Sequence, residues 1–367
     1  MEYKYLPDIS ENIDSCRKPI TAKNRIEGNI PYYGASGVVD HVRDYIFDEE
    51  LLLVSEDGAN LVMRSTPIAF SIAGKTWVNN HAHVLRFKDR KLQAYVEYYL
   101  NHIDLSPYIS GTAQPKLNQQ MLNTIPVPVP SSEKIEKSVA VLDRIVSIKK
   151  RREKELEELD NLIKARFVEL FGNPITNEKG WDTAELNSVC DGIGDGLHGT
   201  PEYDESGDYP FINGNNLMSG IIEITPATKM VNEETYKKHF IELTDNAILL
   251  SINGTLGKLA FYNGEAVMLG KSACYCNLKP EINREFVYGV MKTDAFMGFL
   301  ESNATASTIK NVGLKAIRGF RLILPPEELQ TEFVEFSKQV DKSKVAVQKS
   351  LDETQKLFNS LMQEYFS

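Results

Sequence analysis

The chain has 367 residues, enough for about two or three domains, and 42% of them are hydrophobic, which is sufficient to build compact cores. A formal net charge of −10 excludes a protein that binds nucleic acid through its overall charge, so DNA contacts would need local groups or help from a partner. The N-terminus has no basic region followed by an apolar run, and no stretch approaches roughly eighteen consecutive apolar residues. We therefore expect no signal peptide, no membrane span and a cytoplasmic location.

The first 130 residues are predicted to form a mixed α/β domain. Residues 51–54 are an apolar run before a turn at Asp57-Gly58, a pattern typical of a buried strand. Residues 77–87 are a second strand candidate, and residues 92–102 are predicted to be helical.

Residues 131–171 contain neither glycine nor proline, and they predict one long helix. Ser131 or Ser132 can cap its start, and Gly172-Asn173-Pro174 ends it. At about 1.5 Å per residue it spans roughly 60 Å, more than one compact domain needs. Its apolar residues recur at multiples of seven, as in a coiled coil that is imperfect around 149–152, where Lys149 is the single polar member. The apolar members are Ile135, Leu142, Leu156, Ile163 and Leu170.

The second half of the chain repeats the first. Residues 5–9 match 185–189 and residues 30–34 match 209–214, whereas residues 51–58 match 247–254 at an offset of 196. Segment 110–118 corresponds to 303–311, and 125–130 corresponds to 320–325. Within this half we expect a strand over 269–278, a helix over 284–301 and a loop at the glycine-rich stretch 192–196.

Residues 327–366 form a second stretch without glycine or proline, introduced by Pro325-Pro326 and apolar at three- and four-residue spacings. Because the first helix leads from the first domain to the second, a helix that pairs with it must run back antiparallel. The sequence thus predicts an α+β protein with pseudo-two-fold symmetry. Two mixed α/β domains, 1–130 and 173–326, are joined by two long antiparallel helices, 131–172 and 327–367, which form an intramolecular coiled coil.

Motifs for catalysis are not found in the sequence. It contains no G-x-x-x-x-G-K-[ST], no strand followed by G-x-G-x-x-G, and no H-E-x-x-H. His81 and His83 alternate along a strand-like segment without a third ligand nearby in sequence, so we expect structural or contact histidines and no metal site. Glu56-Asp57 would suit a nuclease, but the repeat carries Ile252-Asn253 there, which argues against catalysis. The four cysteines, expected to be ordinary core or strand thiols, are Cys16, Cys190, Cys274 and Cys276.

Side chains suited to DNA recognition gather beside the glycine-bearing turns. Amides and hydroxyls can reach base edges, and lysines can reach phosphates. In the first half the candidates are Tyr32, Tyr33, Ser36, Asn60, Lys75, Asn79, Asn80, His81, Gln114, Lys116 and Asn118. In the second half they are His198, Thr200, Asn213, Asn215, Asn216, Asn253, Thr255, Lys271, Ser272, Thr305, Ser307, Lys310 and Asn311.

A domain that ends in Gly111-Thr112-Ala113-Gln114-Pro115-Lys116-Leu117-Asn118, followed by Ile125-Pro126-Val127-Pro128-Val129-Pro130 and a long helix, occurs twice over essentially the whole chain. This arrangement resembles the specificity subunit of type I restriction-modification systems. The sequence departs from an even repeat where Thr308-Ile309-Lys310 stands for Pro115-Lys116-Leu117.

The resemblance implies two target recognition domains, each contacting one half of a bipartite double-stranded DNA sequence, and a helical pair that sets the spacer. It also implies assembly with two modification subunits that methylate adenine and, optionally, with two restriction subunits that translocate and cut DNA. S-adenosylmethionine would then bind in the methyltransferase partner, and ATP and Mg²⁺ in the restriction partner, with no cofactor in this chain. Two alternatives remain open: a coiled-coil assembly scaffold without DNA binding, and a stand-alone nuclease.

Overall fold

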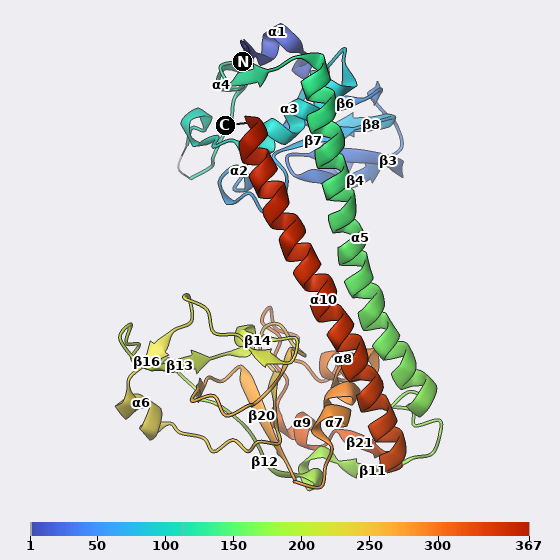
Figure 1. Ribbon diagram of the computed structural model, residues 1–367, viewed down its shortest axis with the longest axis vertical. Coiled ribbons are helices and arrows are strands. Elements are labelled where there is room, and N and C mark those ends of the chain that lie inside the picture. The colour runs from blue at the N-terminus through green and yellow to red at the C-terminus, as the bar shows by residue number, and fades with distance from the viewer. Residues whose placement is uncertain (1, 112, 367) are drawn as a thin grey trace. The chain divides into compact units, whose positions relative to one another are not determined.

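The computed structural model describes residues 2–111 and 113–366 (Figure 1). Three residues of the predicted segments lie outside the described residues: Met1, the first residue of 1–130, Thr112 of 110–118, and Ser367, the last residue of 327–367. The chain forms two compact units: one holds the residues up to Lys154 together with those from Gln348 onward, and the other is Glu155–Val347. Within the described ranges no helix is both long and apolar enough to cross a membrane.

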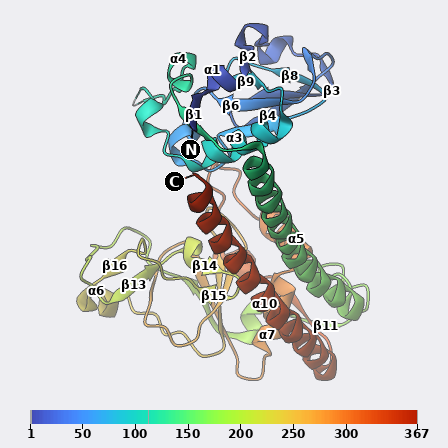
Figure 2. The same cartoon turned by 45° about the horizontal axis from the view of Figure 1, so that its top comes forward.

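Two four-stranded sheets form the globular part of the first unit, with the strand orders β2-β9-β6-β7 and β4-β3-β8-β5 (Figure 2). All five residues of β6 are buried, because this central strand is covered on both faces. In the other sheet β3 and β8 are parallel neighbours. The strands are β2 (Glu11–Asn12), β3 (Glu27–Gly34), β4 (Gly37–Val42), β5 (Phe47–Asp48), β6 (Leu51–Ser55), β7 (Ala69–Ile72), β8 (Lys75–Val78) and β9 (Ala82–Arg86). The helices are α1 (Leu6–Ile9), α2 (Asn60–Met63), α3 (Arg90–His102) and α4 (Gln119–Leu122).

The second unit repeats this topology. Its sheets have the orders β12-β20-β17-β18 and β16-β13-β19, and the parallel pair β13 and β19 takes the place of β3 and β8. The entirely buried β17 matches β6, as the sequence predicted. A short hairpin, β14 with β15, lies between β13 and β17, where this half of the chain is longer than the first half. The strands are β12 (Cys190–Asp195), β13 (Tyr209–Ile212), β14 (Leu217–Met218), β15 (Ile221–Ile222), β16 (Met230–Val231), β17 (Ala247–Ser251), β18 (Leu259–Phe261), β19 (Met268–Leu269) and β20 (Ala273–Leu278). The helices are α6 (Glu233–Lys238), α7 (Arg284–Met291), α8 (Asp294–Ser302) and α9 (Leu314–Arg318).

A two-stranded antiparallel pair links the start of each repeat to the strand that precedes its long helix. In the first unit β1 (Glu2–Tyr5) pairs with β10 (Pro126–Val129), and in the second β11 (Asp182–Glu185) pairs with β21 (Arg321–Leu324). Proline cannot donate a ladder hydrogen bond, so the proline-rich β10 is confined to a short edge of this kind. The prolines therefore mark the passage from domain to helix.

Backbone hydrogen bonds show that the repeat register of the last loop differs from the one expected. Leu117 N donates to Glu56 O, and Val312 N donates to Ile252 O. Gly58 N and Gly254 N donate to the carbonyl oxygens of Pro115 and Lys310. Pro115 is thus equivalent to Lys310, and Leu117 to Val312, at an offset of 195 instead of the expected 193. Both Leu117 and Val312 are fully buried, and this buried residue fixes a register that the polar residues around it leave undefined.

Four local predictions were wrong in detail. The expected strand 77–87 is two strands, β8 and β9, separated by a turn at residues 79–81. The expected strand 269–278 is likewise divided, because β19 ends at Leu269 and β20 begins at Ala273. The expected helix 284–301 is broken into α7 and α8, because the Thr293 hydroxyl donates to Val290 O and accepts from Phe296 N as a new helix cap. The expected loop at 192–196 is mostly strand β12, where a β-carbon on Gly194 would lie 2.8 Å from the Tyr275 hydroxyl oxygen. Glycine there makes room for an aromatic ring, not for a turn.

The long helices are α5 (Ser132–Phe171) and α10 (Glu327–Phe366), each of 40 residues. In the first unit Ile135 and Leu142 of α5 share a core with Phe366 of α10. In the second unit Phe167 of α5 shares a core with Phe333 of α10. The beginning of each helix therefore meets the end of the other, so they pair antiparallel, as predicted.

The polar interruption of the helical seam faces the partner helix. Lys149 Nζ donates to the Gln355 side-chain oxygen and lies 5.5 Å from the centroid of the Phe358 ring, both on α10. Lys150 and Arg151, the next residues, are exposed. The Lys149 ammonium group therefore contacts an aromatic ring and an amide oxygen of α10, all within the first unit.

Gly289 of α7 and Gly298 of α8 provide a matched test of the packing between α7 and α10. Replacing glycine by alanine in a helix normally stabilises it by about 0.5–1 kcal/mol. A β-carbon on Gly298 meets no atom within 4 Å, whereas one on Gly289 would lie 2.5 Å from the buried Phe333 ring. We expect Gly298→Ala to be neutral or stabilising, and Gly289→Ala to destabilise the second unit by about 1–3 kcal/mol. Hydrogen exchange of the β17 amides would measure both changes, and equal effects of the two substitutions would contradict this packing.

Candidate nucleic-acid interface

Four segments of the first domain converge at one place, which we call the first corner: residues 34–37, 56–60, 79–81 and the described residues of 110–118. Asn79 N donates to Tyr33 O, and the Ser55 hydroxyl donates to Ala35 O, which joins the turns after β3, β6 and β8. Glu56 then links two further segments, because its N–H donates to His81 O and its carbonyl oxygen accepts from Leu117 N. Residues far apart in sequence are thereby held at one edge of the domain.

Most candidate residues of the first half lie at this corner. Ser36, Asn80, His81, Gln114 and Lys116 are exposed there. The remaining three are engaged in local structure: Asn79 Oδ1 accepts from His81 N, Asn118 Oδ1 caps α4 by accepting from Met121 N, and the Asn60 amide closes the loop to Thr66. The corner therefore offers a hydroxyl, amides, an imidazole and an ammonium group to solvent.

Three candidates of the first half do not join the corner. Tyr32 is 1% exposed, and its hydroxyl accepts from Ile20 N at 2.9 Å. Tyr33 is half-buried with its ring centroid 6.1 Å from that of Phe70. Lys75 stands at the opposite end of β8, with its ammonium over the Tyr45 ring. Sequence patterns cannot separate these residues from their neighbours because both kinds flank the same turns.

The equivalent segments of the second domain also converge, and we call residues 197–200, 213–216, 252–255, 271–272 and 303–313 the second corner. Ile252 N donates to Ser272 O, and Gly214 N donates to Ser272 Oγ. Lys271 N donates to Leu197 O, which places His198 beside this turn. The exposed candidates here are His198, Thr200, Asn215, Thr255, Lys271, Thr305, Ser307 and Lys310.

The other candidates of the second half hold the second corner together through their side chains. Asn213 Oδ1 accepts from the Ser272 hydroxyl at 3.0 Å, and Asn216 Oδ1 accepts from Asn213 N at 3.0 Å. Asn253 Nδ2 donates to Asn311 Oδ1 at 3.3 Å. All five are partly buried, so they shape the corner more than they present groups to a ligand.

A network of charged side chains lies beneath the first corner, and the sequence alone did not reveal it. His83, 1% exposed, has Nδ1 at 2.6 Å from Asp14 Oδ2 and Nε2 at 2.8 Å from Leu117 O. Arg17 pairs with Asp14 at 3.3 Å and with Glu56 at 2.6 Å, and Lys116 Nζ lies 3.1 Å from the same Glu56 carboxylate. Glu56 and His83 are recognisable in the sequence as residues that could serve catalysis or metal binding, and Lys116 as one that could contact DNA. Asp14 and Arg17 lie about forty residues before Glu56 and carry no motif.

Opposing effects set the pKa values of the two carboxyls. Burial raises the pKa of Asp14, but its contacts with His83, Val84 N and Arg17 outweigh burial and leave it below its usual value. Burial also raises the pKa of Glu56, and Arg17, His83 and Lys116 together lower it further than burial raises it. Both groups are therefore carboxylates at neutral pH.

Asp14, Glu56 and His83 have ligand atoms within 4.8 Å of one another, so the fold supplies the neighbours that His83 lacks in the sequence. The carboxylates already have Arg17 and Lys116 as cationic partners. His83 Nδ1 also faces a carboxylate, not an open coordination position. This arrangement favours an ion-pair network over a divalent metal site.

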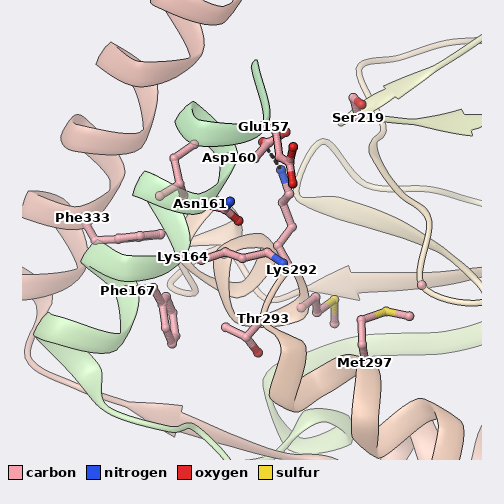
Figure 3. A pocket seen from close by; sticks show the side chains of 14 residues that line it. Glu157, Asp160, Asn161, Lys164, Phe167, Ser219, Lys292, Thr293, Met297 and Phe333 are labelled. Atoms are coloured by element: carbon pink, nitrogen blue, oxygen red, sulfur yellow. Dashed lines mark ion pairs between the residues drawn. The ribbon is translucent and has the colours of Figure 1, made fainter. Parts of the chain in front are cut away.

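A cavity of about 580 Å³ in the second unit lies between α5 and the helices α7 and α8 (Figure 3). Phe167, Phe333 and Met297 supply apolar walls. Lys292 Nζ lies 3.7 Å from Asp160 Oδ1, and burial lowers the pKa of Lys292, with the nearby Lys344 adding to this effect. The residues that line this cavity lie outside the second corner, and most of them belong to α5, α7 and α8. The cavity therefore belongs to the contact between the long helix and the domain.

Comparison with known proteins identifies the class. The family model for the type I restriction modification DNA specificity domain matches residues 1–158 and 178–355. A Haemophilus influenzae protein, provisionally named a type I restriction enzyme specificity subunit, is 28% identical over 277 residues, which cover 72% of this chain and 69% of that protein.

Two solved structures share the fold. The S subunit of a type I restriction-modification system from M. genitalium aligns with a TM-score of 0.57 at 13% identity, over 100% of this chain and 96% of that one. A chain from a study of complex assembly and conformational transition of the type I R-M system aligns with a TM-score of 0.56 at 16% identity, over 100% and 97%.

The chain therefore belongs to the type I restriction-modification DNA specificity family. It is a DNA specificity subunit, and such subunits are not catalytic. The predicted fold class, two mixed domains with two long paired helices, is confirmed by the fold comparison. The scaffold and nuclease alternatives are set aside by this family membership.

Arg17→Met tests the charged network. Arg17 has only 14% of its side chain exposed, and its removal takes a cationic partner from both poorly hydrated carboxylates, although Asp14 keeps His83 and Glu56 keeps Lys116. We therefore expect a loss of at most about 3–5 kcal/mol in the first unit. In the native protein the two lowered pKa values stabilise the fold above the usual carboxyl range, and this stabilisation is lost as the pH falls through the folded-state values.

The variant should therefore be less stable at pH 7 and should lose less stability on acidification to about pH 3. Arg86→Met is the control, because Arg86 pairs with Glu11 and Glu49 while 39% of its side chain is exposed, and we expect it to cost less than about 1 kcal/mol. Denaturant unfolding, monitored through hydrogen exchange of the β6 amides, would measure the stability of both variants. A pH profile of stability in Arg17→Met that parallels the wild type would refute the role assigned to the charged network.

Proposed function

We propose that each corner recognises one half of a bipartite double-stranded DNA target. The observation that carries this proposal is that equivalent segments of the two repeats present exposed amide, hydroxyl, imidazole and ammonium groups at one edge of each domain. Amides and hydroxyls supply the paired donors and acceptors that distinguish base edges, and the ammonium groups suit phosphates. In the first corner these groups belong to Ser36, Asn80, His81, Gln114 and Lys116.

In this proposal residues 1–130 and 173–326 act as the two target recognition domains. The segments 131–172 and 327–367 act as spacer helices, whose paired length fixes the distance between half-sites. A helix pair can serve as a ruler because each helix continues without a break across both units.

We further propose that the chain acts with two modification subunits, which bind S-adenosylmethionine and methylate adenine, and optionally with two restriction subunits that use ATP and Mg²⁺. The chain itself would then bind no cofactor. Its net charge of −10 supports a division of labour, because most of the phosphate contacts would have to come from partner subunits.

Deleting the gene and mapping adenine methylation across the genome tests this function as a whole. We expect a bipartite methylation pattern to disappear, and to return with only one altered half when a chain with an exchanged second corner is supplied. An unchanged pattern in the deletion strain would contradict the proposal.

A heptad inserted into both helices tests the spacer role. Seven residues add about 10.5 Å of helix and nearly two whole turns, so the apolar seam is kept and the half-sites should separate by about three base pairs. The insertions belong after Lys154 in α5 and after Val347 in α10, where the two units meet in sequence. Methylation mapping should show unchanged half-site bases with a longer spacer, and altered half-site bases would contradict a ruler.

Lys116→Ala tests the phosphate role assigned to that residue. Its side chain is 49% exposed at the corner, so we expect weaker binding to all DNA sequences alike and a salt dependence reduced by about one unit of slope. Lys75→Ala, at the far end of β8, is the matched control and should change neither quantity. Binding of the assembled complex to cognate and random duplexes over a range of salt would decide, and relaxation at only one base position would mean that Lys116 contacts a base.

A further inference from the structure

The buried His83 beneath the first corner connects Leu117, in the last segment of that corner, to the core of the domain. Its ring nitrogens lie within hydrogen-bond distance of two different acceptors, the Asp14 carboxylate at 2.6 Å and the backbone carbonyl of Leu117 at 2.8 Å. A carbonyl oxygen can only accept. A carboxylate can also only accept, and both Asp14 oxygens are occupied in that role, Oδ1 by Val84 N at 2.7 Å and Oδ2 by His83 and Arg17.

Both ring nitrogens of His83 must therefore carry hydrogen, because two acceptors face a ring that has two nitrogens. The histidine is an imidazolium cation while both contacts are kept. Its charge is balanced by Asp14 on one side and by Glu56, whose carboxylate lies 3.8 Å from Nδ1. A neutral imidazole has one N–H only, so deprotonation must break one of the two hydrogen bonds.

The bond to Leu117 is the one that bears on recognition. Leu117 is fully buried, and its N–H donates to Glu56 O, so this single residue pins the segment from both backbone groups. On its N-terminal side Lys116 and Ser110 exchange backbone hydrogen bonds at 2.8 Å, which closes the loop that carries Gln114. A Leu117 carbonyl without a donor would be a buried unsatisfied acceptor, a costly state that the loop can relieve only by moving.

The second corner has the same backbone hydrogen bond between strand end and loop, but no histidine of the described residues lies beneath it. Val312 N donates to Ile252 O just as Leu117 N donates to Glu56 O. By the strand register, in which Ser55 faces Ala82 and Ser251 faces Ala273, the residue equivalent to His83 is Cys274. Ile252 replaces Glu56, and Cys274 is fully buried within an apolar core. The two halves of one chain thus differ in whether a titratable side chain holds the recognition loop.

We propose that His83, in its doubly protonated form, is a positioning residue for the recognition segment 110–118, so that recognition of the half-site assigned to the first domain, and not of the other, weakens as the pH rises. This inference rests on the proposed role of the corners. The charged groups that face His83 are Asp14 and Arg17 from the segment after β2, Glu56 from the end of β6, and Lys116 from the loop itself. His81, which is exposed at the rim and pairs with the partly buried Asp57, is the main competing source of pH dependence.

The first measurement needs no DNA. Ring ¹⁵N and attached-proton NMR signals of His83 in the full chain should show two N–H groups at neutral pH, and the exchange protection of the Leu117 and Lys116 amides should fall when those signals disappear at higher pH. A ring with one N–H at neutral pH would overturn the inference, whatever the DNA-binding result.

The second measurement uses the chain assembled with its modification subunits and a cognate bipartite duplex between about pH 6 and about pH 9. Competition with duplexes that carry a base change in one half-site should show discrimination at the first domain's half-site falling on the order of tenfold, with the other half-site unchanged. A parallel loss at both half-sites, or at neither, would overturn the proposal. If base changes in both halves are ignored at every pH while the NMR result holds, the proposed function fails and the loop-positioning part stands.

Variants separate His83 from its neighbours. His83→Gln can donate only one of the two hydrogen bonds without strain, so it should show the high-pH behaviour of the native protein at every pH and a flat profile. His81→Gln should keep the pH dependence of the Leu117 amide, and His41→Gln, at an exposed position of β4, should change nothing.

If His83→Gln does not fold, Asp14→Asn provides the second route, because an amide oxygen in place of the carboxylate oxygen still accepts one hydrogen bond but stabilises the imidazolium less. A pH dependence that survives in His83→Gln and vanishes in His81→Gln would assign the effect to the rim.

Discussion

Aromatic packing between the long helices and each globular domain is the interaction on which the rest of the structure depends. In the first unit Phe366, near the end of α10, has its ring centroid 5.0 Å from that of Tyr95 and 5.7 Å from that of Tyr99 on α3. In the second unit Phe167 of α5 lies 5.3 Å from Phe333 of α10, and Phe171 lies 5.1 Å from Phe286 of α7. Each domain core is therefore completed by side chains from both helices. Close packing of each domain against both helices supports the spacer role proposed for them.

The corners are built on a second constraint, the fully buried strands β6 and β17. The turn after each strand binds the last loop of its domain through a backbone hydrogen bond. Leu117 N donates to Glu56 O in the first repeat, and Val312 N donates to Ile252 O in the second. This frame leaves the exposed side chains free to differ, because none of the frame's hydrogen bonds depends on them. Under the function proposed for the corners, the contacts to DNA can accordingly vary while the fold is kept.

The two repeats solve the same problem with different chemistry. The first places a charged network under its loop, and the second places an apolar core with Cys274 and Ile252 there, supported by amide pairs such as Asn253 with Asn311. Ion pairs between partly buried groups respond to pH and to the loss of one partner, whereas apolar packing does not. A change in pH is thus predicted to affect the first corner more than the second, although both corners belong to one chain.

The sequence by itself determined the repeat, the two long helices, the buried strands and the family. These features are written in local periodicity, in proline and glycine at element ends, and in self-similarity, all of which are visible without contacts. It also placed most candidate residues in turns that the fold brings together, but it could not separate the buried Tyr32 from the exposed Ser36, since burial depends on what packs above a turn. Only the tertiary structure decided the register of the last loop, the break at Thr293 and the network around His83. Asp14 and His83 are sixty-nine residues apart and touch only because β2 pairs with β9, a pairing that no short-range pattern records.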